Sequence, residues 1–418
     1  MSFSTQRFLP IEKGVDTMDK KKRNWVIISA VILMSVLLVL GPGASAQAAT
    51  KTLKVGMVMP LSGPISFVGV GLTRAVRLYF DKVNEEGGLQ IGGDTYMIDL
   101  IAEDSKMDPT VASTATKKLV YKDEANFVFG AITPPVAAAI YQVCERAKAL
   151  HIITWIDAPA MPGDISPKKH YAIRLNPTSD TNWEMNYDFL RENYPQAKKL
   201  YIVAPDSGLP IETKAKKLAE EKGLTLVGYN IWPIGAEDFT PYYTKALATN
   251  PDIIQGANSA QAGFQLRTAR QLGFKGVFIS DSPLAPAIIL SIVGEEGSHD
   301  VLTNGMDFAH PTPGIKESME RWAKVTDDPY FEDTPVTYAQ AEVFVQALKK
   351  ANSVEVEKVI ATFESMTTPG SFDTCWGPAH MSGKKTFGVN RVLNRPVPQT
   401  RLMNGKIEFV GLKIPALE

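Results

Sequence analysis

Cysteine and histidine are scarce in this chain, which has two cysteines and five histidines among 418 residues. So few cysteines exclude a small scaffold held together by disulfides. No two histidines have the H-E-x-x-H spacing or another close spacing, so the sequence predicts no metal site. Cys144 and Cys375 lie on separate predicted segments. An oxidising compartment would let them form a disulfide, and two free buried thiols are the alternative.

The motifs that indicate an enzyme are also missing. The segment around Ser259, Gly256-Ala257-Asn258-Ser259-Ala260, does not match the G-x-S-x-G nucleophile elbow, and there is no P-loop lysine motif. Gly69-Val70-Gly71 follows a predicted strand as in a dinucleotide-binding turn, but Arg74 replaces the third glycine. We therefore expect neither catalysis nor a bound cofactor.

Charge of one sign is not in excess, since the formal net charge is −1. Residues 1–46 hold six basic and three acidic side chains, and without them 38 basic and 42 acidic residues remain, a net charge of −4. A mildly acidic chain gives no reason to expect a nucleic acid as partner. The composition, 44% hydrophobic and 21% charged, is that of a folded globular protein.

Residues 18–46 have the three parts of a signal peptide. These are a basic stretch, Met18–Arg23, an apolar run of 16 residues, Trp25–Leu40, and a small-x-small cleavage site, Ala44–Ala46. A membrane-spanning helix needs roughly 20 apolar residues, so an uncleaved anchor is the weaker alternative. Residues 1–17 precede this signal and are interpreted as an upstream extension. No cysteine stands directly after the apolar run, where a lipid would be attached, so we expect export to the periplasm without a lipid anchor.

From Thr52 onward, short apolar strands alternate with amphipathic helices. Apolar residues alternate over 53–59, as in a strand, and keep helical spacing over 72–83. The same reasoning predicts strands at 96–100, 127–129 and 151–154, with helices from Asp108 and over 134–149. This alternation indicates a parallel sheet covered by helices on both faces.

The alternation breaks near 171–179 and then restarts. Further strands are predicted at 199–204, 224–231, 252–256, 277–280 and about 301–306. Helices are predicted around 211–222, 239–248, 260–272, 284–293, 314–325, 335–350 and 354–364, before a tail with a strand at 406–410. Two successive α/β halves predict two lobes with a cleft between them. Ligands bind beyond the carboxyl ends of the strands in such sheets, so the residues that follow each strand should line the cleft.

A series of short motifs runs through the chain in order: Lys54-Val55-Gly56, Leu61-Ser62-Gly63-Pro64, Gly69, Asn84-Glu85-Glu86-Gly87-Gly88-Leu89, Asp104 with Asp108-Pro109, Gly235-Ala236-Glu237-Asp238-Phe239 and Leu272-Gly273-Phe274. Each motif alone is weak. In this order, after a signal peptide, they resemble the type I periplasmic binding proteins of the branched-chain amino acid kind. The resemblance covers essentially all of the chain that follows the signal peptide.

The resemblance implies two Rossmann-like lobes joined by three crossovers, which close around a ligand in the cleft. The implied bounds are 50–173 plus 308–367 for lobe 1, 180–298 plus 379–418 for lobe 2, and about 174–179, 299–307 and 368–378 for the crossovers. The implied function is capture of a small amino acid or related compound for the permease of an ABC importer, by a monomer. A periplasmic sensor of the same fold, which feeds a signalling partner, is the alternative.

In amino-acid binders of this family, the loops after the third and fourth strands hold the ligand carboxylate with hydroxyls and backbone N–H groups. The corresponding residues here are Thr133 and Pro134 in one loop, and Trp155 and Asp157 in the next. Pro134 and Pro135 remove two N–H donors from a turn that would bind an anion. In the alternative interpretation, Pro134 only starts a helix, Asp157 is a solvated loop carboxylate and Trp155 is a buried packing residue.

Other family positions also carry different residue types here. The aromatic residue of the first loop corresponds to Val68, with Phe67 beside it. The tyrosines of lobe 2 correspond to about Leu209 and Ser259, and the acidic residue that holds an amino group corresponds to Ser282, beside Asp281. These departures favour a ligand with an aromatic or amide group. The predicted ligand-binding residues are Ser62, Phe67, Val68, Thr133, Pro134, Trp155, Asp157, Leu209, Asn258, Ser259, Asp281 and Ser282.

Overall fold

The computed structural model describes residues 25, 49–63, 65–154, 165–206, 211–233, 236–256, 261–280 and 284–415. The chain divides into two units, Met1–Ala49 and Thr50–Glu418, and the helices and strands with described bounds lie in the second. The predicted signal peptide lies, apart from Trp25, outside the described residues. Within the described part of the chain, no helix has the length and apolar character needed to cross a membrane.

The first sheet is built from strands of both the first half and the end of the chain. Its strands are β1 (Thr50–Met59), β2 (Leu89–Ile91), β3 (Asp94–Asp104), β4 (Phe127–Gly130), β5 (Leu150–Ile153), β6 (Ala172–Arg174), β12 (Phe372–Thr374), β13 (Gly377–Ser382) and β14 (Val392–Asn394). Their order is β12-β13-β14-β6-β5-β4-β1-β3-β2. The strands from β14 to β3 pair in parallel, while β2, β12 and β13 pair antiparallel.

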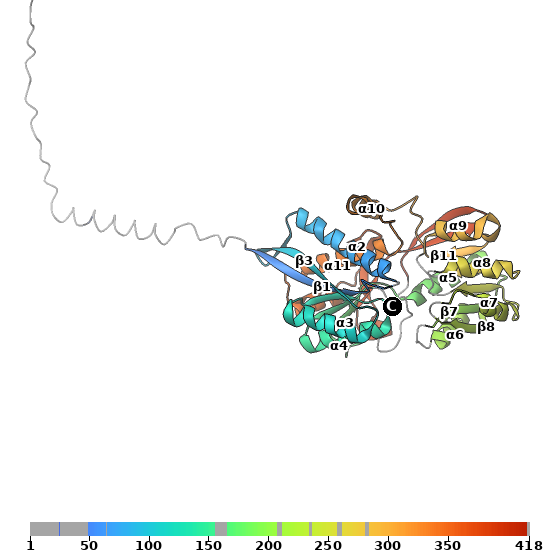
Figure 1. The fold of residues 1–418 in the computed structure, drawn as a ribbon, viewed down its shortest axis with the longest axis horizontal. Coiled ribbons are helices and arrows are strands. Elements are labelled where there is room, and N and C mark those ends of the chain that lie inside the picture. Colours follow the sequence, from blue (N-terminus) through green and yellow to red (C-terminus); the bar gives the residue numbers. More distant parts are fainter. Residues whose placement is uncertain are drawn as a thin grey trace, which may run out of the picture. The chain divides into compact units, whose positions relative to one another are not determined.

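The second sheet comes from the middle of the chain and its end. Its strands are β7 (Lys199–Pro205), β8 (Thr225–Trp232), β9 (Ile253–Gly256), β10 (Val277–Ser280), β11 (Val301–Thr303), β15 (Val397–Met403) and β16 (Lys406–Lys413). The order is β16-β15-β11-β10-β9-β7-β8, with parallel pairing from β8 to β11 and antiparallel pairing of β15 and β16. The two mainly parallel sheets confirm the predicted α/β fold class (Figure 1).

Helices follow most of the parallel strands. They are α2 (Ser66–Glu85), α3 (Pro109–Lys117), α4 (Pro134–Ala147), α5 (Ser179–Asn193), α6 (Ile211–Glu221), α7 (Thr240–Leu247), α8 (Ala262–Gln271), α9 (Pro286–Gly297), α10 (Pro313–Val325), α11 (Thr334–Ala351), α12 (Val356–Ser365) and α13 (Lys384–Phe387), with a π-helical turn at Lys118–Lys122. The start of α3 agrees with the sequence: the Asp108 carboxylate accepts hydrogen bonds from the N–H groups of Thr110 (2.7 Å) and Val111 (2.9 Å).

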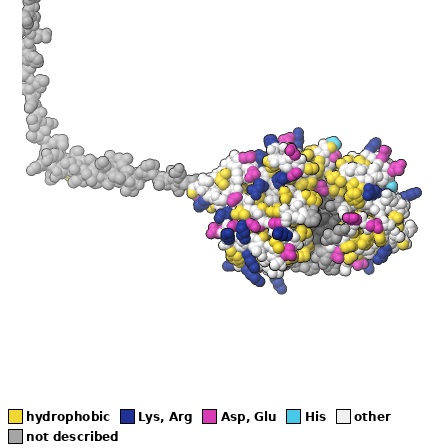
Figure 2. Space-filling model, in the orientation of Figure 1, with side chains coloured by type: hydrophobic (Ala, Val, Ile, Leu, Met, Phe, Trp, Pro, Cys, Tyr) yellow, Lys and Arg dark blue, Asp and Glu magenta, His cyan; other side chains and the backbone are white. Residues whose placement is uncertain are grey.

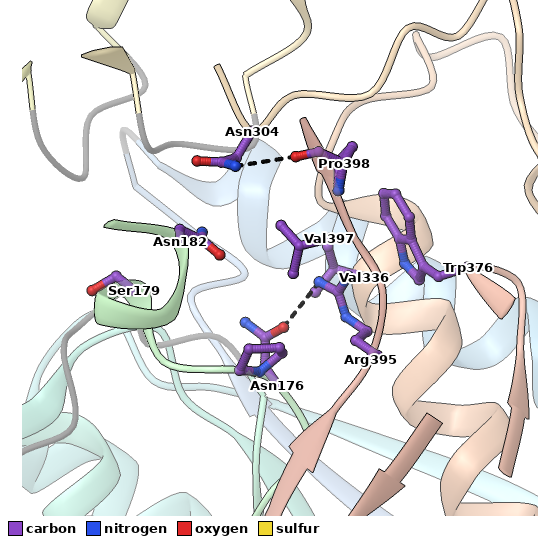
Figure 3. Close-up of a pocket in the computed structure, with 10 residues that line it drawn as sticks. Asn176, Ser179, Asn182, Asn304, Val336, Trp376, Arg395, Val397 and Pro398 are labelled. Carbon is purple, nitrogen blue, oxygen red and sulfur yellow. Dashed lines mark hydrogen bonds between the residues drawn. The ribbon is translucent and has the colours of Figure 1, made fainter. Parts of the chain in front are cut away.

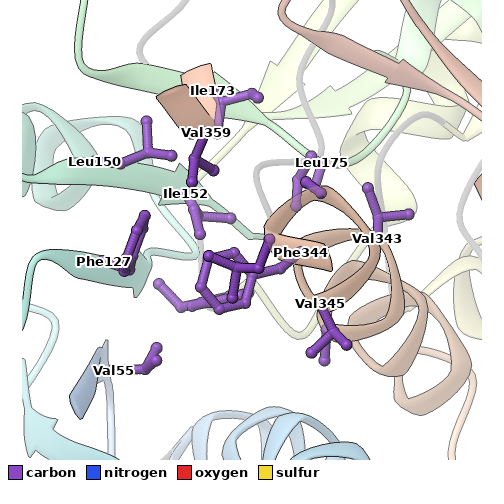
Figure 4. Close-up of a cluster of buried hydrophobic side chains, with 14 of the residues drawn as sticks. Val55, Phe127, Leu150, Ile152, Ile173, Leu175, Val343, Phe344, Val345 and Val359 are labelled. Atoms are coloured by element: carbon purple, nitrogen blue, oxygen red, sulfur yellow. The ribbon is translucent and has the colours of Figure 1, made fainter. Parts of the chain in front are cut away.

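The core of the first sheet is split between its two faces. Alternate residues of β1, including Val55 and Met57, join a cluster with α2 and α11, in which Phe344 of α11 packs edge-to-face on Phe127 and Phe129 (Figure 4). On the opposite face, Val58 packs with residues of α3 and α4. Because successive strand residues point to opposite faces and both faces are covered, β4, β5 and the second half of β1 are buried at every position.

The second sheet is covered in the same way. Leu200 and Ile202 of β7 pack with α5 and α6 in one cluster. Tyr201 and Val203, one residue out of phase, pack with α7, α8 and α9 in another. The face of the molecule drawn in Figure 2 carries interspersed basic and acidic side chains, in keeping with the low net charge.

Three connections pass between the sheets. They run from β6 to α5, from β11 to α10 and from β14 to β15. The predicted lobe bounds stay a prediction, with one correction that the strand order requires. We expected residues 379–418 in lobe 2 after a crossover at 368–378, yet β12, β13 and β14 belong to the first sheet. The reason is that β14 pairs in parallel with β6 and β13 pairs with β14, which extends the first sheet before the chain crosses.

The two cysteines are free and buried, so the structure does not contain the disulfide considered from the sequence. Cys144 lies in α4 and packs in the cluster under α3 and α4. Cys375 lies between β12 and β13, in a separate cluster with Trp322 and Trp376. Burial raises the pKa of both thiols, which keeps them protonated and unreactive.

Candidate functional site

The carboxyl ends of parallel strands lie side by side at one edge of each sheet. In the first sheet, β1 ends at Met59, β4 at Gly130 and β5 at Ile153, and the chain turns from the first two into α2 and α4. This edge holds the predicted positions Ser62, Phe67, Val68, Thr133 and Pro134. It is the edge at which parallel α/β sheets bind ligands.

The loop after β1 is fixed by Asp104, the last residue of β3. The Asp104 carboxylate accepts hydrogen bonds from the Leu61 N–H (2.8 Å), the Ser62 hydroxyl (2.5 Å) and the Lys106 N–H (2.9 Å). Desolvation raises the pKa of Asp104, but these hydrogen bonds outweigh it and lower the pKa below the ordinary value. The Ser62 hydroxyl therefore donates its hydrogen bond to Asp104, and its oxygen lone pairs remain available to accept a hydrogen bond from a ligand.

The two candidates at the start of α2 differ in exposure. The Phe67 side chain is 71% exposed, whereas Val68 is partly buried and packs against the core of the first sheet. An exposed aromatic ring beside the strand ends can form an apolar wall of a site. Val68 instead contributes to the attachment of α2 to its sheet.

Thr133 and Pro134 lie where the helix α4 begins. Thr133 has extended backbone angles at the N-cap position, and its hydroxyl makes no capping hydrogen bond. Pro134 and Pro135 occupy the first two helical positions and have no N–H to offer. The turn therefore presents a hydroxyl, in place of the cluster of N–H donors that usually binds an anion at a helix start.

Buried polar groups stand at two further strand ends. Thr154, directly after β5, accepts a hydrogen bond on its carbonyl from the Gln340 amide of α11, and the Gln340 side-chain oxygen has no partner. In the second sheet, the hydroxyl of Ser280 at the end of β10 is buried without a hydrogen bond. Unsatisfied groups of this kind are rare in protein interiors and mark positions where a ligand or water supplies the missing partner.

The other predicted site residues lie outside the described residues. They are Trp155, Asp157, Leu209, Asn258, Ser259, Asp281 and Ser282. The strands that precede them are described, and β7, β9 and β10 end at Pro205, Gly256 and Ser280. Adjacent parallel pairing places these three ends at one edge of the second sheet. The part that these seven residues play stays a prediction.

A cavity lies where the three connections between the sheets come together (Figure 3). Its volume is about 40 Å³, which admits water-sized groups and excludes a metabolite. Each connection contributes a polar residue within two positions of its strand: Asn176 after β6, Asn304 after β11 and Arg395 after β14. Asn182 of α5 and Trp376 also line the cavity.

Arg395 is the charged group of this cavity. It is 5% exposed, donates to the carbonyl of Pro396 (2.8 Å) and to the amide oxygen of Asn176 (3.0 Å), and lies 4.8 Å from the centre of the Trp376 ring. Burial lowers its pKa to about 10, partly opposed by Cys375 and Asp333. None of these residues belongs to the predicted site. The signal that was available is that an amide or guanidinium side chain stands within two positions of the end of each of these three strands.

No group of three or more histidine, cysteine, aspartate or glutamate side chains in the described segments is placed to hold a metal ion. Among the described residues, this edge presents hydroxyls, amides, apolar surface and backbone groups, besides the Asp104 carboxylate. Such an edge can bind a small organic molecule through hydrogen bonds and packing.

Comparison with known proteins agrees with this architecture. A family model described as "Periplasmic binding protein" matches residues 52–404. A relative from Brucella abortus, Leu/Ile/Val-binding protein homolog 8, is 22% identical over 349 residues, which cover 77% of this chain and 82% of that protein.

Two solved structures with bound ligands have the same fold. The branched-chain amino acid transporter substrate-binding protein of Streptococcus pneumoniae, in complex with isoleucine, has a TM-score of 0.67 at 16% identity and covers 87% of this chain and 100% of its own. A solute-binding protein of an ABC transporter from R. palustris, in complex with 4-hydroxybenzoate, has a TM-score of 0.69 at 18% identity and covers 87% of this chain and 97% of its own.

Proposed function

This chain belongs to the type I periplasmic binding proteins of the branched-chain amino acid family, and we propose that it is the solute-binding component of an ABC importer. The observation that carries the proposal is the pair of mainly parallel sheets joined by three connections. A ligand held between the carboxyl ends of both sheets links binding to the angle between them. A permease can then distinguish the loaded receptor from the empty one.

The proposed ligand is an amino acid or a related small carboxylate or amide, with an aromatic group as the favoured variant. Pro134 and Pro135 support this departure from an ordinary amino acid, because they remove N–H donors that would hold a carboxylate. The exposed ring of Phe67 supports an aromatic partner. The two similar structures described above contain isoleucine and 4-hydroxybenzoate, so both chemical classes belong in a test.

The proposed site joins both sheet edges. From the first sheet come Ser62, Phe67, Val68, Thr133 and Pro134. From the loops outside the described residues come Trp155, Asp157, Leu209, Asn258, Ser259, Asp281 and Ser282. The proposed location is the periplasm, after removal of residues 18–46 as a signal peptide. The permease is the proposed protein partner, and the receptor acts as a monomer.

The experiment is thermal unfolding of residues 47–418 with a panel of aliphatic and aromatic amino acids, aromatic carboxylates, amides and short peptides. A ligand at a hundred times its dissociation constant stabilises the folded state by about 2.7 kcal/mol. Saturable stabilisation by one chemical class supports the proposal. If no compound raises the unfolding temperature, even after partial unfolding to remove carried-over ligand, the result counts against solute binding by this chain.

A pair of threonine variants tests the site. Thr133→Val removes the free hydroxyl at the start of α4, and we expect a loss of affinity of about fivefold if the hydroxyl contacts the ligand, because a hydrogen bond is worth about 1 kcal/mol. Thr225→Val, at an exposed position of β8 in the second sheet, is the matched control. Equal affinities of Thr133→Val and the control would remove Thr133 from the site.

A further inference from the structure

Two buried arginines four residues apart have opposite surroundings. Arg391 is 4% exposed, and its Nε–H donates to the Glu364 carboxylate at 2.6 Å. Arg395 is equally buried, but the hydrogen-bond partners that the described residues give it, Pro396 and Asn176, are both neutral. Its Nε–H is buried without an acceptor. A buried charge is costly unless it is paired, so Arg395 needs a compensation that Arg391 already has.

The groups around Arg395 compensate its charge only in part. Asp333 favours the charged guanidinium, while the hydrogen bonds of Arg395 go to the neutral groups of Pro396 and Asn176. The Trp376 ring, at 4.8 Å, adds a cation–π contact, which is weaker than a buried carboxylate. Even with the lowered pKa, Arg395 stays positively charged at neutral pH.

The cavity of about 40 Å³ lies directly beside this guanidinium. Its polar lining consists of Arg395 and of the side chains of Asn176, Ser179, Asn182 and Asn304 (Figure 3). Asn304 already donates to the carbonyl of Pro398, and it accepts from Asn186, so it is held in place. A cavity of this size next to an incompletely paired cation fits a monatomic ion and excludes an amino acid.

We propose that this cavity is a binding site for one compact monovalent anion of chloride size, held by the Nε–H of Arg395. The anion would supply the acceptor and the negative charge that Arg395 lacks. Because the lining comes from all three connections between the sheets, an occupied site joins these connections. Anion binding is then linked to the angle between the two sheets, and through this angle to ligand binding.

Bromide, which replaces chloride and scatters anomalously, tests the site directly. We expect an anomalous peak at Arg395 in crystals of the purified protein soaked in sodium bromide. Arg391 is the internal control in the same map, because its carboxylate partner leaves no place for an anion. A map with bromide at surface sites but with none, or with only a water, at Arg395 would overturn the proposal.

Thermal unfolding in sodium chloride and in sodium gluconate at equal ionic strength gives a second test. Above the dissociation constant, each tenfold rise in chloride should lower the unfolding equilibrium constant of the wild type tenfold. Arg395→Gln should lose this dependence, and Arg391→Gln should keep it. Equal dependence in wild type and Arg395→Gln would contradict the proposal, and if Arg395→Gln does not fold, the bromide map decides. No organic ligand enters either measurement, so a failure here leaves the receptor function untouched.

Discussion

At the scale of single residues, His151 makes stability depend on pH. It is fully buried in β5, with Nε2 2.7 Å from the Gly130 carbonyl, and its Nδ1 has no partner. Burial lowers its pKa to about 4, against a smaller opposing effect of the Gly130 hydrogen bond. Below the unfolded pKa of about 6.5, the unfolded chain binds a proton that the folded chain does not.

We therefore predict that acidification from about pH 6.5 to about pH 4 destabilises the protein through His151, by at most about 1.4 kcal/mol per pH unit. His151→Leu should show a shallower loss over this range in urea unfolding. His299→Leu is the control, because the Nδ1 of this exposed ring lies 2.9 Å from the backbone carbonyl of Glu296. A pH dependence of His151→Leu as steep as that of the wild type would contradict the assignment.

The two thiols give a second prediction at this scale. Cys144 and Cys375 are both free and buried, with raised pKa values. A thiol reagent should detect no thiol in the native protein and two per chain after unfolding without reductant, since only an exposed thiolate reacts. Absence of both thiols in the unfolded protein would show that they pair after all.

At the scale of elements, the start of α2 depends on Gly69. A Cβ atom at Gly69 would lie 2.0 Å from the backbone oxygen of Pro60, in the loop after β1. Gly69→Ala must therefore move this loop away from the helix, and we predict a loss of about 1–3 kcal/mol in urea unfolding. Because Ser62 belongs to the same loop, ligand affinity should also fall.

Val70→Ala is the control for this change. Val70 lies on the same helix and is 37% exposed, so its truncation should change stability by no more than about 0.5 kcal/mol. Equal stability of Gly69→Ala and Val70→Ala would show that the loop accommodates a methyl group.

The elements that the sequence predicts well are those with a strong local signal. Central strands of both sheets, such as β4 and β9, are buried on both faces, and the helix predicted over 335–350 is found as α11, Thr334–Ala351. The pattern predicts no element over 180–198, yet α5 lies there, with Trp183 and Tyr187 buried among many polar residues. Strands β12 to β14 were also missed: β12 and β14 have three residues each, too few for a recognisable periodicity, and β13, with six, begins with Gly377-Pro378 and has no clear alternation.

At the scale of the whole molecule, chain order alone does not determine which sheet a late strand joins. The return of β13 and β14 to the first sheet depends on the pairing of β14 with β6, about 220 residues earlier in the chain, and no local pattern records it. For the same reason the cavity around Arg395 could not be found from the sequence, since it exists only where three distant connections meet. The position of the strand-end loops, by contrast, was predictable because every parallel strand of a sheet points its carboxyl end to the same edge. That these loops bind the ligand stays a prediction.

Uptake by intact cells tests the receptor function most directly. The compound that stabilises the purified protein is labelled, and its uptake is measured in three kinds of cells: cells that make this protein, cells that lack it, and cells in which it has been restored. The proposed function predicts that uptake at low concentration is lost with the chain and regained with it, and that a variant impaired in binding does not restore it. Unchanged uptake, with binding intact, would contradict an importer component and favour a sensor of the same fold.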